Sequence, residues 1–216
     1  MSDEEPGSAR RPGLRTSRME AFSDGVFAIA ITLLVLEIAV PDGAEDDLLG
    51  AVLDQWPSYL SYLVSFATIG AIWLKHTVIT GYLSAANAVL VRLNLLVLLV
   101  VSFLPFPTRL LAEHFRFEGA GRVATTVYGI NLLLASALVG VLWRYALRAR
   151  LVRPDTTDED VAMLSRRLVP SLGGYLVMIV VGLFLPVLAV LGYLAIAVFI
   201  IVPFHAFRRR TSSAEA

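Results

Sequence analysis

The chain has no cysteine and little charge, and each shortage excludes a class of protein. Without cysteine, disulfides, iron–sulfur clusters and thiolate metal sites are excluded. Charged residues make up 17% of the 216 residues and hydrophobic residues 57%, whereas soluble domains carry about a quarter charged residues. The mean hydropathy is +0.73. This composition predicts an integral membrane protein.

Motifs for catalysis or metal binding are also missing. The three histidines, His76, His114 and His205, are too far apart in sequence for a local metal motif. The chain has no Gly-x-Ser-x-Gly elbow and no pair of acids at a shared depth. We therefore expect no enzyme activity, metal or cofactor. Lys and Arg number 18, as do Asp and Glu, so net charge identifies no partner, and we expect no nucleic-acid ligand.

Long uncharged runs predict the membrane spans and an all-α fold. The run from Leu168 to Phe207 has forty residues, enough for two crossings with a hairpin at Pro186. Near the N-terminus only twelve uncharged residues separate Asp24 from Glu37; these cover about 18 Å, less than the ~30 Å hydrocarbon layer. The sequence predicts six transmembrane helices, at about residues 18–40, 56–79, 85–108, 122–147, 168–185 and 187–207.

The distribution of positive charge predicts the orientation. With a cytoplasmic N-terminus, fifteen of the eighteen Lys and Arg residues lie inside, leaving Arg109, Arg116 and Arg122 outside. Both termini are thus expected in the cytoplasm. The outer loops are acidic, which either keeps them solvated or concentrates cations near the membrane. The expected domains are a disordered tail at 1–17, a six-helix transmembrane domain at 18–208 and a second tail at 209–216.

The first predicted helix carries a stripe of apolar residues. Projected at 100° per residue, the stripe occupies an arc of about 80°. Its members are four or three residues apart, a spacing by which like helices pack around a shared axis. Asp24 lies nearly opposite and should face protein or water, because an acid is costly against lipid. The stripe is free to meet lipid, a neighbouring helix or a pore axis. Its members are Phe22, Val26, Ile29, Leu33, Leu36 and Val40.

The stretch RMEAFSDGVFAIAITLLVLEI, residues 18–38, resembles the first helix of the transmembrane protein 175 family of potassium channels. The family's Arg-x-x-x-Phe-Ser-Asp motif is complete here, and its Trp-x-x-His on the second helix and asparagines on the third are also matched. The motif occurs once, so the resemblance implies the single-repeat bacterial form, a homotetramer in the inner (plasma) membrane. The matching residues are Arg18, Phe22, Ser23, Asp24, Trp73, His76, Asn87 and Asn94.

The resemblance implies that the first helices of four copies line a path for potassium and other monovalent cations. The family lacks a Thr-Val-Gly-Tyr-Gly filter, which is also absent from this sequence, and uses apolar rings instead. Carried over by position, the narrowest ring is Ile29, followed outward by Leu33 and Leu36, with Thr32 beside the pore. We expect these rings to gate by dewetting and to select ions. Glu37 either attracts cations at the outer vestibule or interacts with the loop that follows.

The polar motif residues are expected to brace the helices rather than to touch the ion. Arg18, Ser23 and Asp24 would tie the inner end of the first helix to the second and third helices through charge-assisted hydrogen bonds. Trp73 and His76 share a face and can supply donors. His76 equally suits an interfacial position near the cytoplasmic surface.

A secondary transporter or proton-coupled cation carrier is the alternative function. Transporters usually contain internal repeats and helices broken near the midplane. Here Pro105 and Pro107 lie near a predicted helix end, Pro186 lies in a hairpin, and no repeated motif relates the two halves. The sequence therefore favours a channel.

Overall fold

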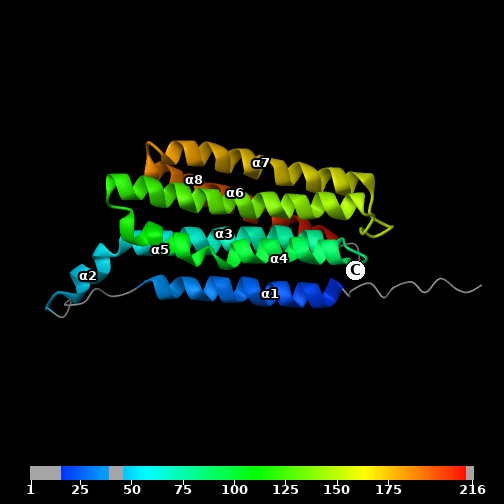
Figure 1. Cartoon of the computed structure of the whole chain (residues 1–216), viewed down its shortest axis with the longest axis horizontal. Helices are drawn as coiled ribbons and strands as arrows, with labels where there is room; N and C mark the ends of the chain where they lie inside the picture. The colour runs from blue at the N-terminus through cyan, green and yellow to red at the C-terminus, as the bar shows by residue number, and fades with distance from the viewer. Residues whose placement is uncertain (1–15, 39–45, 213–216) are drawn as a thin grey trace, which may run out of the picture.

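The computed structural model describes residues 16–38 and 46–212, and in them the elements are helices apart from one isolated β-bridge. The helices lie side by side in an elongated bundle (Figure 1). This confirms the predicted all-α class. Within the described residues a shorter apolar helix, Pro186–Val202, accompanies five helical spans long and apolar enough to cross a membrane. These spans are Thr16–Glu37, Trp56–Gly81, Ala88–His114, Gly119–Arg148 and Asp158–Gly182.

The first helix lies on one side of the bundle (Figure 1). It consists of α1, Thr16–Leu33, which continues as the 3-10 turn η1, Leu34–Glu37. It packs against the next two long helices, α3 and α4. Val40, like residues 1–15 of the predicted N-terminal tail, lies outside the described residues, whereas the last two residues of that tail belong to α1.

The third predicted helix is divided into two. After the short α2, Leu48–Asp54, and the long α3, Trp56–Gly81, the chain forms α4, Ala88–Ser102, and then α5, Pro105–His114. Both prolines of this segment fall in the first turn of α5, where a missing N–H breaks no helical hydrogen bond. The helical segment therefore extends to His114, beyond the predicted end at residue 108.

The second half of the bundle contains α6, Glu118–Arg148, α7, Asp158–Gly182, and α8, Pro186–Ser212. The break between α7 and α8 confirms the predicted hairpin at Pro186. The start of α7 was predicted ten residues too late, at 168, because a capping box extends the helix. The Thr157 side chain and the Asp160 backbone N–H are 3.2 Å apart, and the Asp160 carboxylate accepts from the Thr157 backbone. The predicted C-terminal tail is helical to Ser212, and 213–216 lie outside the described residues.

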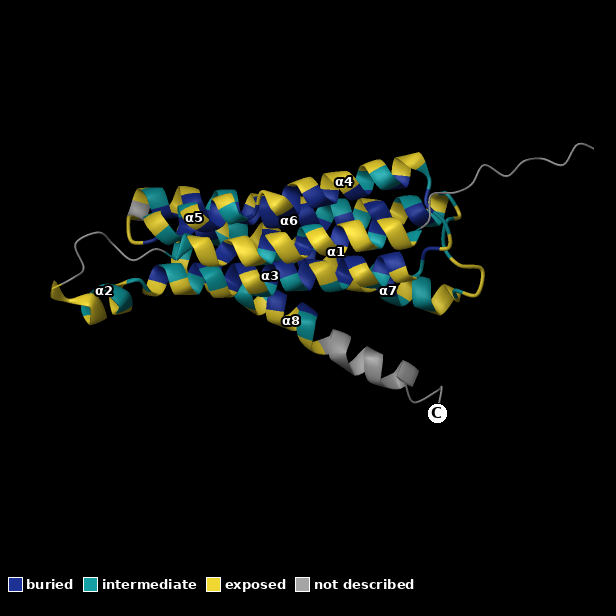
Figure 2. Cartoon of the chain, turned by 90° about the horizontal axis from the view of Figure 1, so that it is seen from below, coloured by how far each residue is buried: buried dark blue, intermediate teal, exposed yellow. Residues whose placement is uncertain are grey.

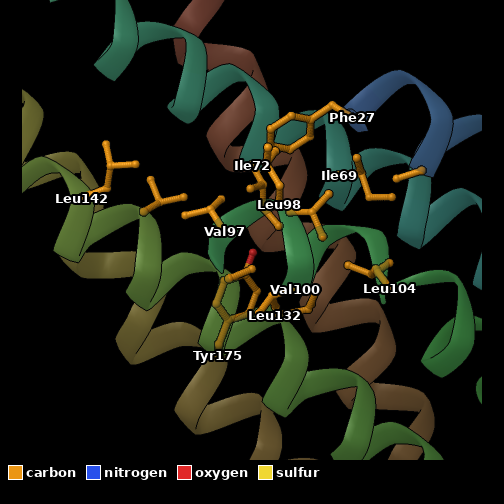
Figure 3. Packing of buried hydrophobic residues seen from close by; sticks show 14 of the residues in the cluster. Phe27, Ile69, Ile72, Val97, Leu98, Val100, Leu104, Leu132, Leu142 and Tyr175 are labelled. Carbon is orange, nitrogen blue, oxygen red and sulfur yellow. The ribbon is translucent and has the colours of Figure 1, made fainter. Parts of the chain in front are cut away.

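Side chains from most of the long helices meet in one continuous apolar core (Figure 3). Phe27 of α1, Ile72 of α3, Val97 of α4, Leu132 of α6 and Tyr175 of α7 are all buried there. Because lipid tails are as apolar as these side chains, close packing rather than exclusion from water holds such helices together in a bilayer. This packing fixes the position of the buried face of α1.

Candidate functional site

The first helix has a buried face and a broad exposed face. The buried residues recur four or three apart and pack on α3 and α4. Of the predicted pore residues, Ile29 is 60% exposed, Leu33 42% and Leu36 71%. Figure 2, seen from the side on which α1 lies, shows exposed residues along the length of this helix. The buried residues are Met19, Ser23, Phe27, Ala30 and Leu34.

The buried face lies between Asp24 and the apolar stripe. At 100° per residue, the centre of the buried residues is about 100° from the stripe and about 100° from Asp24 on the other side. The helix face that packs against the chain's own helices is therefore centred on Phe27 and Ala30. The position of Asp24 opposite the stripe had implied a face centred on Asp24. Val26, at the edge of the stripe, packs against the core, whereas Phe22 is 57% exposed.

A buried chain of hydrogen bonds joins α1 to α3 and α4. The His76 Nε2 atom lies 2.7 Å from Asn94 Oδ1, and Asn94 Nδ2 donates to Ser23 Oγ at 2.9 Å. Ser23 Oγ donates in turn to the Met19 carbonyl at 2.8 Å. The His76 ring also packs on Phe27, with 5.4 Å between ring centroids. His76 is buried within this network.

A second, more exposed contact joins α1 to α3. The indole Nε1 of Trp73 donates to Asp24 Oδ1 at 2.8 Å. The carboxylate thus has a partner although it is exposed in the single chain. Arg18 is exposed and makes no hydrogen bond or ion pair with a residue that the structure describes, which differs from its predicted bracing role.

Asn87 does not join this network. It caps α4, where its Oδ1 accepts from the Leu90 backbone N–H at 2.9 Å, and its Nδ2 donates to the Tyr145 hydroxyl at 2.9 Å on α6. The signal for this role was present in the sequence, because an asparagine directly before an apolar helix is a preferred N-cap. Asn87 thus lies apart from the bonded group of Ser23, His76 and Asn94.

The C-terminal end of the first helix carries the two predicted flanking residues. Thr32 is exposed, and its hydroxyl donates to the Ile29 carbonyl of the same helix at 2.9 Å. The Glu37 carboxylate lies 3.9 Å from Arg109 Nε on α5, and that arginine also donates to Glu113 at 2.8 Å. The negative charge of Glu37 is therefore partly offset by its neighbour.

One polar cluster was not anticipated. The Ser65 hydroxyl of α3 lies 2.8 Å from that of Thr108 on α5 and 3.0 Å from that of Tyr128 on α6, and all three are buried. Such interhelical hydrogen bonds connect packed membrane helices. The sequence signal that could have predicted this cluster is the presence of hydroxyl residues inside otherwise apolar helices.

Comparison with known proteins assigns the chain to a family. A family model described as the endosomal/lysosomal potassium channel TMEM175 matches residues 18–105. A protein from Streptomyces collinus, named a potassium channel, is 42% identical over 153 residues, which cover 70% of this chain and 74% of that protein. The chain belongs to the TMEM175 family.

Other TMEM175 proteins extend the comparison. A crystal structure titled as a lysosomal potassium-selective channel TMEM175 homologue from Chamaesiphon minutus has a TM-score of 0.80 and 37% identity, over 88% of this chain and 97% of that one. The chicken protein named endosomal/lysosomal proton channel TMEM175 is 36% identical over 143 residues, 62% of this chain and 28% of that protein. Because it has several helices apolar enough to cross a membrane and belongs to a family of ion channels, the chain is a multi-pass membrane protein.

Proposed function

We propose that this chain is the subunit of a potassium channel in which α1 helices from several copies surround the conduction path. The observation that carries the proposal is the exposure of Ile29, Leu33 and Leu36 on a helix whose other face is packed into the protein. Such an exposed apolar face meets lipid, a neighbouring helix or a pore axis, and the resemblance of this helix to the first helix of the channel family favours the pore axis. Membership of a family of ion channels supports conduction rather than catalysis.

The family resemblance implies four copies. Arranged around one axis, they would place these side chains in successive apolar rings. A ring too narrow for water excludes ions, and a small widening admits both. The proposed gate and selectivity region is therefore the same set of side chains. Potassium is less costly to dehydrate than sodium, which gives such a constriction a modest preference for potassium. Thr32 and the partly neutralised Glu37 would flank this path.

The hydrogen bonds at the inner end of α1 support this arrangement by holding its rotation. Ser23 is bonded to Asn94 on one neighbouring helix, and Asp24 to Trp73 on another. A helix fixed at two points around its circumference resists rolling about its axis. The stripe would thus keep a constant direction toward the other copies in a bacterial inner membrane.

Reconstitution of the purified protein distinguishes a channel from a carrier. In planar bilayers with potassium on one side and sodium on the other, we expect discrete unitary current steps and a reversal potential displaced toward potassium. A pH gradient at equal salt measures proton permeation in the same bilayer. Flux without unitary steps that requires a counter-ion would instead establish the carrier alternative.

The contact between Asp24 and Trp73 makes a prediction about folding. Replacing Asp24 by Ala leaves the indole N–H without its acceptor, so the yield of folded, monodisperse protein should fall roughly two- to tenfold. Asp24→Asn keeps an acceptor oxygen, so the yield of folded protein should fall less. Size-exclusion chromatography of detergent-extracted protein measures the yield.

A double-mutant cycle provides the control for this prediction. Trp73→Phe removes the same donor, so adding it to Asp24→Ala should cause little further loss. Independent losses from the two changes would contradict the contact. A normal yield of Asp24→Ala with altered ion selectivity would place Asp24 in the pore rather than in the brace.

A further inference from the structure

A cavity of about 760 Å³ lies between α3, α7 and α8, away from α1. Its volume is within the range of about 300–1,000 Å³ that small-molecule sites occupy. Ile196 and Phe199 of α8 contribute to an apolar wall, and Phe199 is largely exposed. Lys75, Arg166, Arg167 and Ser171 supply polar groups. The cavity thus combines an apolar wall with a cationic side.

Lys75 is an unusual member of this lining because it is only 3% exposed. Its Nζ donates to Ser171 Oγ at 2.7 Å, and Ser171 is itself bonded to the Leu168 carbonyl at 3.0 Å. An ammonium group has three donors, and no carboxylate among the described residues lies within ion-pair distance of this one. A buried charge without a counter-charge is costly. The site therefore favours an anion beside Lys75.

The other charges of the cavity have the same sign. Arg166 and Arg167 are consecutive and exposed on α7, and no acidic side chain lines the cavity among the residues that the structure describes. Cations gathered in a low-dielectric concavity concentrate anions there. The cavity is thus complementary to a ligand with a negative head and an apolar tail.

The position of the cavity suits a lipid from one leaflet. The end of α3 and the start of α7 lie at the same end of the bundle as the start of α1 (Figure 1), where the backbones of Tyr82 and Arg153 are joined at 2.9 Å. Arg166 and Arg167 directly precede the uncharged run of α7. Lys75 is six residues, about 9 Å, from the end of α3. These cations therefore lie near the polar boundary of the membrane.

We propose that this cavity binds the phosphate headgroup of an anionic phospholipid, with the first part of an acyl chain along α8. Basic pockets between transmembrane helices are a known mode of lipid headgroup recognition. The phosphate would contact the Lys75 ammonium and the two arginines, and the chain would lie on Ile196 and Phe199. Because the cavity is separate from the α1 stripe, the proposal does not depend on channel activity.

Native mass spectrometry of the full-length protein tests the proposal. Titration with dioleoyl phosphatidylglycerol should give saturable binding, and the same titration with dioleoyl phosphatidylcholine should bind at least about tenfold more weakly. Arg166→Gln with Arg167→Gln should weaken phosphatidylglycerol binding roughly ten- to thirtyfold. Both arginines are exposed, and size-exclusion chromatography of the variant checks that it still folds. Lys75→Met tests the buried ammonium.

The matched control is Arg144→Gln with Arg148→Gln, an exposed pair at the same end of the bundle on α6 and outside this cavity. This pair should leave phosphatidylglycerol affinity unchanged. Equal binding of the two lipids, equal losses in the two double variants, or unchanged affinity in Arg166→Gln with Arg167→Gln would each overturn the proposal. So would binding of glycerol 3-phosphate alone at the same affinity, because that would identify a site for soluble anions.

Discussion

Replacing Ile29 by Asn should raise potassium flux through the reconstituted protein at least about tenfold, equivalent to a barrier lower by about 1.4 kcal/mol. Ile29 is exposed on the stripe that we propose lines the pore. A ring of amides wets a constriction that a ring of isoleucines keeps dry. The preference for potassium over sodium should fall at the same time. Bi-ionic recordings in planar bilayers measure both quantities.

A pair of alanine substitutions separates the role of this face from a general loosening of α1. Ile29→Ala widens the proposed ring and should also increase flux, whereas Val35→Ala should not. Both side chains are exposed and β-branched, but Val35 is not a member of the stripe and lies in the 3-10 turn η1. Equal increases for both variants would contradict the pore assignment of Ile29. Unchanged permeation in Ile29→Asn would remove it from the constriction.

The helical pattern of the chain was predictable because hydrophobic runs and breakers act locally. The hairpin at Pro186 was predicted from a forty-residue run and one proline, and the structure confirms it. The membrane helix was predicted to begin at 168 because the uncharged run begins there, whereas α7 is one continuous helix from Asp158. There the capping box between Thr157 and Asp160 starts the helix, and the acidic side chains of the first turn stabilise its N-terminus.

The hydrogen-bond network in the N-terminal half of α1 was predictable only in part. Family resemblance grouped Ser23, Asn94 and His76, and the structure joins them by hydrogen bonds. Resemblance does not specify which atoms meet. Asn87 therefore appeared equivalent to Asn94, although one lies before the first turn of α4 and the other faces the core. Arg18 likewise belongs to the motif but makes no such bond within the described chain.

Lys75 illustrates a limit of reading charge from sequence. A lysine near a predicted helix end normally extends to the membrane surface, so its charge was counted only for orientation. Its burial depends on α7, which begins some eighty residues later and brings Ser171 to within 2.7 Å. No local pattern around residue 75 records that approach. Long-range contacts of this kind determine the cavity but leave no periodic signal.

Replacing Asn94 by Leu should destabilise the folded chain by about 2 kcal/mol, because it leaves buried polar groups without partners. Asn94 accepts from His76 and donates to Ser23, and all three side chains are buried. For a chain of this size such a loss lowers the melting temperature by roughly 4–8 °C. Thermal unfolding of the protein in mild detergent measures the shift.

Asn131→Leu is the matched control, because it makes the same change at another buried asparagine. Asn131 has one long contact, from Nδ2 to the Val100 carbonyl at 3.4 Å, and its removal should lower the melting temperature by less than about 2 °C. Equal shifts in the two variants would show that the network around Asn94 adds nothing beyond an ordinary interhelical contact. A larger shift for Asn94→Leu, accompanied by weaker potassium discrimination in the protein that still folds, would connect the buried network to the direction of the α1 stripe. The hydrogen bonds of Ser23 would then contribute to ion selection without touching the ion.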